Sequence, residues 1–122
     1  MSSLNREISG PALFHHLKRD QLTLDQKLLT DHGRTARTLV KEGPLRLTLM
    51  GLAEGGDLPE HKTSGPVSIH VIEGSVTFSG SGREFPLGPG EVLMFAANVA
   101  HSAKSAEGCV FLLTVVHEER ES

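Results

Sequence analysis

Two stretches of the chain decide its fold: GGDLPEHKTSGPVSIHVIEG (residues 55–74) and GEVLMFAANVAHSAKS (residues 90–105). Each begins with glycine; the first carries His61 and His70, and the second carries His101. Glycine, proline and asparagine mark tight turns, and the apolar β-branched run between residues 67 and 72 is typical of a strand. Both stretches therefore predict short strands joined by turns.

The same pattern of short strands and turns extends from residue 35 to the end of the chain. Glycine-containing turns separate eight candidate strands: Arg37–Lys41, Leu45–Ala53, Val67–Glu73, Ser75–Ser79, Arg83–Leu87, Glu91–Ala96, Ala100–Ser105 and Cys109–His117. Many short strands with such turns predict an all-β sandwich or small barrel. The last strand is apolar on both faces, so it needs a cover outside the barrel as well as a core inside.

The first third of the chain has a different character. Between Pro11 and His32 the apolar residues recur mostly at spacings of three and four, which predicts one or two short amphipathic helices broken near residues 20–23. Gly33 is placed to end the helical region as a C-terminal cap. We expect an N-terminal helical extension (1–34), a barrel (35–117) and a charged tail (118–122) in a chain of single-domain length.

The spacing of residues in the two stretches resembles that of the conserved-barrel (RmlC-like) cupins. Their first motif reads Gly, five residues, His, one residue, His, three or four residues, Glu, six residues, Gly. Their second motif reads Gly, five residues, Pro, one residue, Gly, two residues, His, three residues, Asn. The corresponding positions in this chain are Gly55, His61, Thr63, Val67 and Gly74, then Gly90, Ala96, Asn98, His101 and Ser105.

The resemblance implies a single, jelly-roll-like cupin barrel preceded by the short N-terminal helices. It also implies a site, because metal-binding cupins use two histidines and a glutamate from the first motif and a histidine from the second. Only His61 and His101 remain at those positions, since Thr63 is a poor ligand and Val67 cannot coordinate a metal ion. Two protein ligands make a weak site, because even catalytic zinc typically keeps three.

His70 is a third candidate ligand, and its role depends on which face of its strand it occupies. On a regular strand Val67, Ile69 and Val71 point one way and His70 points the other way. A bulge near Gly65–Pro66 would reverse this parity. His61, His70 and His101 would then form a three-histidine site for a divalent transition metal such as Fe, Mn, Ni, Zn or Cu.

Three functional hypotheses follow. The first is a barrel that binds a divalent metal, a small organic ligand or both through His61 and His101, as a metal-dependent oxygenase or isomerase would. The second is a metal-free binding or sensing barrel with an apolar lumen around Val67, Ile69 and Val71. The third is a structural dimer whose pocket is vestigial. The sequence assigns no catalytic residue.

Composition narrows the choice of partners. The chain has 12 Lys and Arg against 15 Asp and Glu, with no basic stripe, which disfavours nucleic acid. It has no apolar run of membrane-spanning length, and its start lacks the apolar core of a signal peptide. Because Cys109 is the single cysteine, no disulfide is possible within the chain, which fits a reducing compartment. We expect a cytoplasmic homodimer, away from membranes, with a small-molecule ligand or substrate.

Overall fold

The computed structural model describes residues 8–117, within which three short helical segments precede nine strands. The helical segments are α1 (Leu17–Asp20), the 3-10 turn η2 (Gln21–Thr23) and α2 (Gln26–His32). The strands are β1 (Arg34–Glu42), β2 (Leu45–Leu52), β3 (Asp57–His61), β4 (Val67–Gly74), β5 (Val76–Gly80), β6 (Arg83–Leu87), β7 (Val92–Phe95), β8 (His101–Lys104) and β9 (Cys109–Val116). The predicted tail, residues 118–122, lies outside the described residues. No helix within residues 8–117 is long and apolar enough to cross a membrane.

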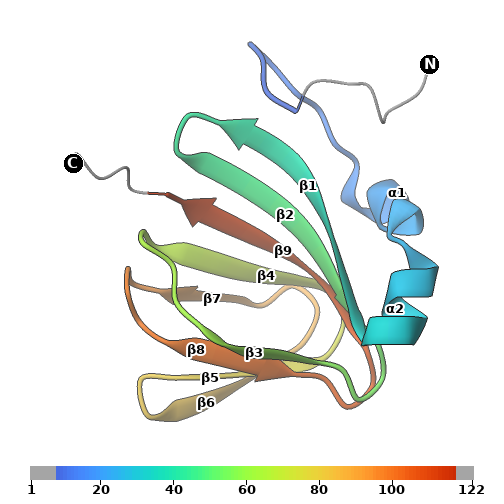
Figure 1. The fold of residues 1–122 in the computed structure, drawn as a ribbon, viewed down its shortest axis with the longest axis vertical. Helices are drawn as coiled ribbons and strands as arrows, with labels where there is room; N and C mark the ends of the chain where they lie inside the picture. The colour runs from blue at the N-terminus through green and yellow to red at the C-terminus, as the bar shows by residue number, and fades with distance from the viewer. Residues whose placement is uncertain (1–7, 118–122) are drawn as a thin grey trace.

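The strands form two antiparallel sheets that face each other. The larger sheet has the order β1-β2-β9-β4-β7 and the smaller one the order β3-β8-β5-β6. Figure 1 shows the helical segments beside β1, at the end of the barrel away from the β1–β2 and β5–β6 turns. The predicted all-β barrel with short N-terminal helices is confirmed, and so is the cap at Gly33, whose φ is +80°.

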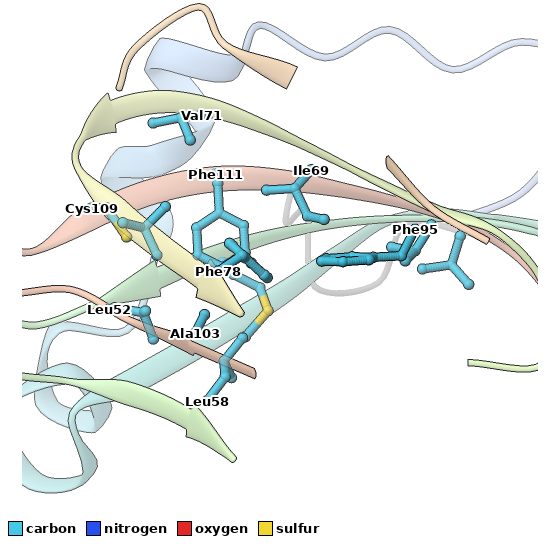
Figure 2. Close-up of a cluster of buried hydrophobic side chains, with 13 residues drawn as sticks. Leu52, Leu58, Ile69, Val71, Phe78, Phe95, Ala103, Cys109 and Phe111 are labelled. Carbon is cyan, nitrogen blue, oxygen red and sulfur yellow. The ribbon is translucent and has the colours of Figure 1, made fainter. Parts of the chain in front are cut away.

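The interior between the sheets is a packed hydrophobic core (Figure 2). Along β4 the residues Val67, Ile69 and Val71 are 2%, 0% and 0% exposed, as the alternation of the strand predicts. They pack with Phe78 of β5 and Phe111 of β9, whose rings meet edge to face with centroids 5.6 Å apart. Side chains therefore fill the lumen from Val67 to Val71. A ligand site must lie beyond Val67, at the end of the barrel where β4 and β8 begin.

A second, smaller cluster covers the outer face of the larger sheet. Leu24, just after η2, is buried with Leu39 of β1 and Leu49 of β2, and Leu112 of β9 packs against them. The N-terminal segment thus supplies part of the outer cover that the doubly apolar strand β9 was expected to need. Two apolar side chains on the edge strand β7, Val92 and Met94, remain 62% and 60% exposed. The predicted homodimer stays a prediction.

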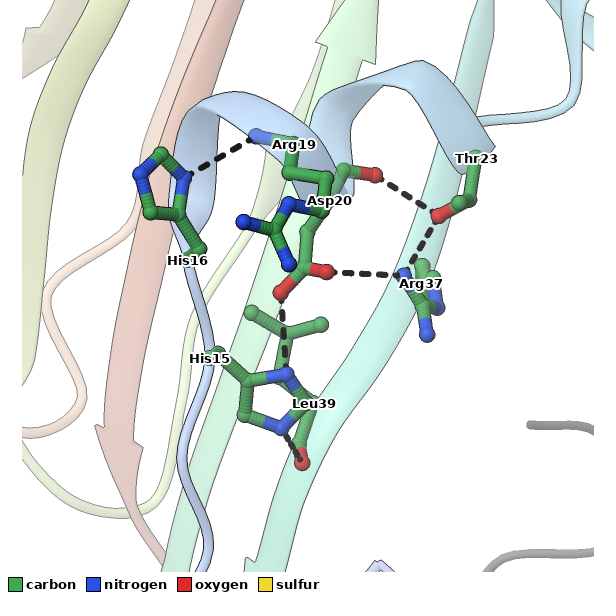
Figure 3. A network of polar contacts seen from close by, with 7 residues as sticks. All are labelled: His15, His16, Arg19, Asp20, Thr23, Arg37 and Leu39. Atoms are coloured by element: carbon green, nitrogen blue, oxygen red, sulfur yellow. Dashed lines mark hydrogen bonds and ion pairs between the residues drawn. The ribbon is translucent and has the colours of Figure 1, made fainter. Parts of the chain in front are cut away.

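Polar contacts hold the N-terminal segment against β1 (Figure 3). His15 Nδ1 lies 2.9 Å from Asp20 Oδ2, and its Nε2 lies 2.9 Å from the carbonyl oxygen of Leu39. The Arg37 guanidinium contacts Asp20 Oδ1 at 3.7 Å and donates to the Thr23 hydroxyl. These contacts fix the segment in register with β1, so that Leu24 reaches its buried position.

One strand was not predicted. The sequence predicted no strand between Ala53 and Val67, whereas Asp57–His61 forms β3 and pairs with β8. Its register is irregular between Leu58 and His61, so Pro59 and Glu60 interrupt the alternation that would have marked a strand. β1 also begins earlier than predicted, at Arg34.

If the N-terminal segment folds as part of the barrel, Leu22 and Leu24 should differ sharply in how much each side chain contributes to the free energy of unfolding. Leu24 is 4% exposed, whereas Leu22 is 79% exposed. We expect Leu24→Ala to lower the free energy of unfolding by about 2–5 kcal/mol and Leu22→Ala to change it by less than about 0.5 kcal/mol. Urea denaturation followed by circular dichroism measures both. Equal effects of the two substitutions would contradict this packing.

Candidate active site at the open end of the barrel

The two motif histidines meet at one end of the barrel. His61 is the last residue of β3 and His101 the first of β8, and the strand register places them directly opposite each other. Their ring centroids are 4.4 Å apart and their planes are inclined by 70°. His61 is exposed, while His101 is only 3% exposed beneath it. The structure therefore brings together two of the three histidines singled out in the sequence.

Both rings are oriented by the same local hydrogen bond. His61 Nδ1 lies 3.0 Å from the carbonyl oxygen of Pro59, and His101 Nδ1 lies 2.9 Å from that of Val99. A carbonyl oxygen only accepts, so each Nδ1 must carry the hydrogen and donate it. In a neutral ring this leaves Nε2 with a free lone pair. The pair thus offers two Nε2 acceptors to a ligand.

Burial sets the charge state of the inner histidine. Desolvation lowers the pKa of His101 below its ordinary value of 6.5. The hydrogen bond to the Val99 carbonyl opposes this shift, and the neighbouring His61 adds to it by disfavouring a second positive charge. His101 is therefore a neutral imidazole at neutral pH, with an Nε2 that can accept a proton or a hydrogen bond.

An aromatic side chain backs the inner histidine. The ring of Phe95, at the end of β7, stacks on His101 with centroids 4.8 Å apart and planes inclined by 4°. Gly80 of β5 makes room for this stack, because a Cβ there would lie 2.6 Å from Phe95 Cε1. The sequence analysis missed both residues. The available signal was that Phe95 directly precedes a motif position, Ala96.

The other motif positions have structural roles. Thr63 donates its hydroxyl hydrogen to the Gly65 carbonyl at 2.7 Å and accepts the Asn98 N–H on its own carbonyl at 2.8 Å. Asn98, which stands where the cupin motif has glycine, has a φ of +64°, a left-handed conformation that asparagine tolerates. Ser105 is 2% exposed and donates to the Ser75 carbonyl. The contacts of Thr63 and Asn98 hold the loops next to the histidine pair, whereas Ser105 follows β8 at the other end of the barrel.

His70 lies apart from the histidine pair. β4 pairs regularly from Val67 to Val71, and its irregularity comes later, between Val71 and Glu73. No bulge at its start reverses the parity, so His70 shares the outer face with its register partners Val92 and Leu112. The structure does not bring His70 to His61 and His101.

The side chains present do not make a complete metal site. Within residues 8–117, no three His, Cys, Asp or Glu side chains are grouped so as to hold a metal ion. The hydrogen bonds from Nδ1 of His61 and His101 would orient each Nε2 as a metal ligand. However, Val67 and Thr63 supply no third donor, since the first is apolar and the second is engaged with Gly65. Two neutral imidazoles fall short of the three protein ligands that even an open catalytic site usually has.

Comparison with known proteins fits this geometry. A family model described as the cupin domain matches residues 48–116, more than half of the chain. The chain belongs to the cupin family. The cupin fold is, in general, that of a barrel that binds small molecules or metals. No curated protein matches the chain.

Solved cupin structures share the fold at low sequence identity. A conserved protein of unknown function from Streptococcus pyogenes is 22% identical, with a TM-score of 0.67 over 74% of this chain and 79% of that one. An RmlC-like cupin from Shewanella frigidimarina is 18% identical, with a TM-score of 0.68 over 73% and 80%. A cupin 2 conserved barrel domain protein from Leptotrichia buccalis is 26% identical, with a TM-score of 0.66 over 70% and 42%.

The buried histidine should make the cupin less stable in acid. Because the pKa of His101 is lowered on folding, the unfolded chain takes up a proton first as the pH falls below about 6.5, and the folded state loses stability. We expect His101→Gln to remove this contribution. The free energy of unfolding, measured by urea denaturation between about pH 7 and pH 5, should then fall less steeply than in the parent. If the free energies of unfolding of the parent and of His101→Gln fell equally steeply with pH, the lowered pKa of His101 would be contradicted.

Proposed function

We propose that the open end of this cupin barrel binds a small organic molecule directly, with His61 and His101 as the polar centre of the site. The observation that carries the proposal is that both Nδ1 atoms are held by backbone carbonyls, which leaves both Nε2 atoms for a ligand. A ligand site typically combines an apolar wall with a few convergent polar groups. The histidine pair supplies the polar groups, and Phe95, which is 4% exposed, backs His101 from the core side.

The ligand would lie at the rim rather than deep in the lumen. Ile69 and Val71, which an apolar lumen site would have used, are fully buried and pack against other side chains. The ring of the exposed His61 lies against the buried ring of His101. We expect a small molecule to donate a hydrogen bond to one Nε2 while its apolar part contacts the exposed ring of His61.

The chemistry of the pair suits proton transfer. His101 is neutral at neutral pH, so its Nε2 can take a proton from a bound ligand and return it, which is the elementary step of an isomerisation. We derive no step through a metal, because the two imidazoles do not complete a metal site. A metal would need its remaining ligands from the bound molecule.

The proposal predicts fragment binding that depends on the histidines. Benzamide combines an aromatic ring with an amide N–H that can donate to Nε2, and we expect it to bind the untagged, metal-free protein. His101→Ala should weaken that binding about fivefold or more through the lost hydrogen bond. His32→Ala, at the exposed end of α2, serves as the matched control. Chemical-shift titration measures each dissociation constant.

Elemental analysis of the purified, untagged protein measures its metal content and so distinguishes direct ligand binding from a metal site. A protein free of metal, with fragment binding lost in His61→Ala and His101→Ala but not in His32→Ala, would support direct binding. About one metal per chain, lost in both variants of the pair, would overturn it in favour of a metal site. Binding that is unchanged in His101→Ala would also overturn it.

A further inference from the structure

A second cavity lies between the N-terminal segment and the barrel. Its volume is about 620 Å³, and its walls come from η2 and α2 on one side and from the ends of β2 and β4 and the start of β9 on the other. β4 begins at the open end of the barrel with Val67 and ends at this cavity with Gly74. The cavity therefore lies at the opposite end of the barrel from His61 and His101, and neither histidine lines it.

Leucine side chains form the apolar part of the cavity wall. Leu24 and Leu52 are 4% and 3% exposed, whereas Leu22, which lines the same cavity, is 79% exposed. A bound molecule that covered Leu22 would remove apolar surface from water, which favours binding. The cavity thus has an apolar side chain that the fold leaves uncovered.

One polar atom of the cavity wall lacks the partner that a buried acceptor needs. Gln21 lines the cavity, and its Oε1 is buried. Within residues 8–117 it is the only buried side-chain nitrogen or oxygen without a hydrogen bond. A buried acceptor left unpaired costs free energy, and a donor on a bound molecule would remove that cost. The unpaired oxygen therefore points to a ligand that carries a hydrogen-bond donor.

An irregularity in β4 turns a carboxylate toward the same cavity. On a regular strand Glu73 would follow Ile69 and Val71 into the core, because residues two apart share a face. The register shifts between Val71 and Glu73, so that Glu73 becomes the partner of Val110, which packs against the outer hydrophobic cluster. Glu73 and Val110 both line the cavity. Bulges often re-aim a side chain next to a functional site, and this one re-aims Glu73.

Glu107 adds a second carboxylate, from the turn before β9. Its Oε1 accepts a hydrogen bond from the Ser75 hydroxyl at 3.0 Å, which orients the carboxylate and leaves Oε2 for another donor. Within residues 8–117, no ion pair involves Glu73 or Glu107. No lysine, arginine or histidine lines the cavity. The charged groups of the cavity wall are therefore both negative.

We propose that this cavity binds a small organic ammonium ion with an apolar body, as a second ligand site of the protein. Both carboxylates attract the positive charge, the ammonium N–H groups suit acceptors such as Gln21 Oε1, and the apolar body covers Leu22. Hydrogen bonds to charged groups are stronger than those between neutral groups, so an ammonium ion is favoured over a neutral alcohol of the same shape. The inference does not rest on the proposed function, because the cavity shares no residue with the histidine pair.

The pair 2-phenylethylammonium and 2-phenylethanol tests this inference, because the two molecules have nearly the same shape and differ in charge. We expect the parent to bind the ammonium ion about tenfold more tightly than the alcohol, as measured by chemical-shift titration at about pH 7. Glu73→Gln and Glu107→Gln should each reduce this preference about threefold or more. Glu84→Gln, an exposed carboxylate of β6 outside the cavity, is the matched control and should leave the preference unchanged.

Two further variants test the uncharged part of the cavity wall. Gln21→Met keeps the length of the side chain but removes its oxygen, and should weaken binding of 2-phenylethylammonium about threefold or more. Leu22→Ala should weaken binding of both molecules, because they share the same apolar body. In the parent, the shifts that change on titration should be those of residues 21–29 and 107–110.

The other outcomes would overturn the inference. They are equal affinity for the two molecules, a preference that is unchanged in both glutamate variants, and binding of the ammonium ion that is unchanged in Gln21→Met. Failure of the parent to bind 2-phenylethylammonium would overturn it too, without bearing on the histidine site. Shift changes at His61 and His101 in place of the cavity residues would also contradict it. Glu73 and Glu107 are exposed, so their glutamine variants are expected to fold, and circular dichroism and the urea midpoint check this.

Discussion

The candidate site depends on the pairing of β3 with β8, which sets His61 against His101 at the open end of the barrel. Within that pairing each ring donates Nδ1–H to a carbonyl two residues earlier in the chain. A side chain held by its own local backbone keeps its orientation without help from a ligand. The pair therefore exists in the free protein as two preset acceptors, which lowers the cost of ordering the site on binding.

Much of the fold could be predicted from the sequence because turns are local. The spacing between Gly55 and Gly74, and between Gly90 and Ser105, sets the lengths of the strands and turns around the two histidines. Asn98 took the left-handed conformation that its motif position requires. The simple alternation of β4 likewise placed Val67 inward and His70 outward, because residues two apart share a face of a strand.

The features that could not be predicted depend on contacts distant in sequence. β3 was not predicted because its irregular register removes the alternation of inward and outward residues that marks a strand. The stack of Phe95 on His101 joins β7 to β8 across the two sheets, and it needs the missing side chain of Gly80. The register from β2 through β9 to β4 places Arg46 on the same inner face as Val67, which the local sequence does not reveal.

The protonation of the imidazole nitrogens of His61 and His101 tests the account's central claim most directly. Long-range ¹H–¹⁵N correlation spectra of the free protein, recorded at about pH 8, distinguish a protonated from an unprotonated ring nitrogen. The account predicts that both rings carry hydrogen on Nδ1 and none on Nε2. A ring with hydrogen on Nε2 would contradict it, because the carbonyl of Pro59 or Val99 would then face a bare nitrogen and the preset acceptor would be lost.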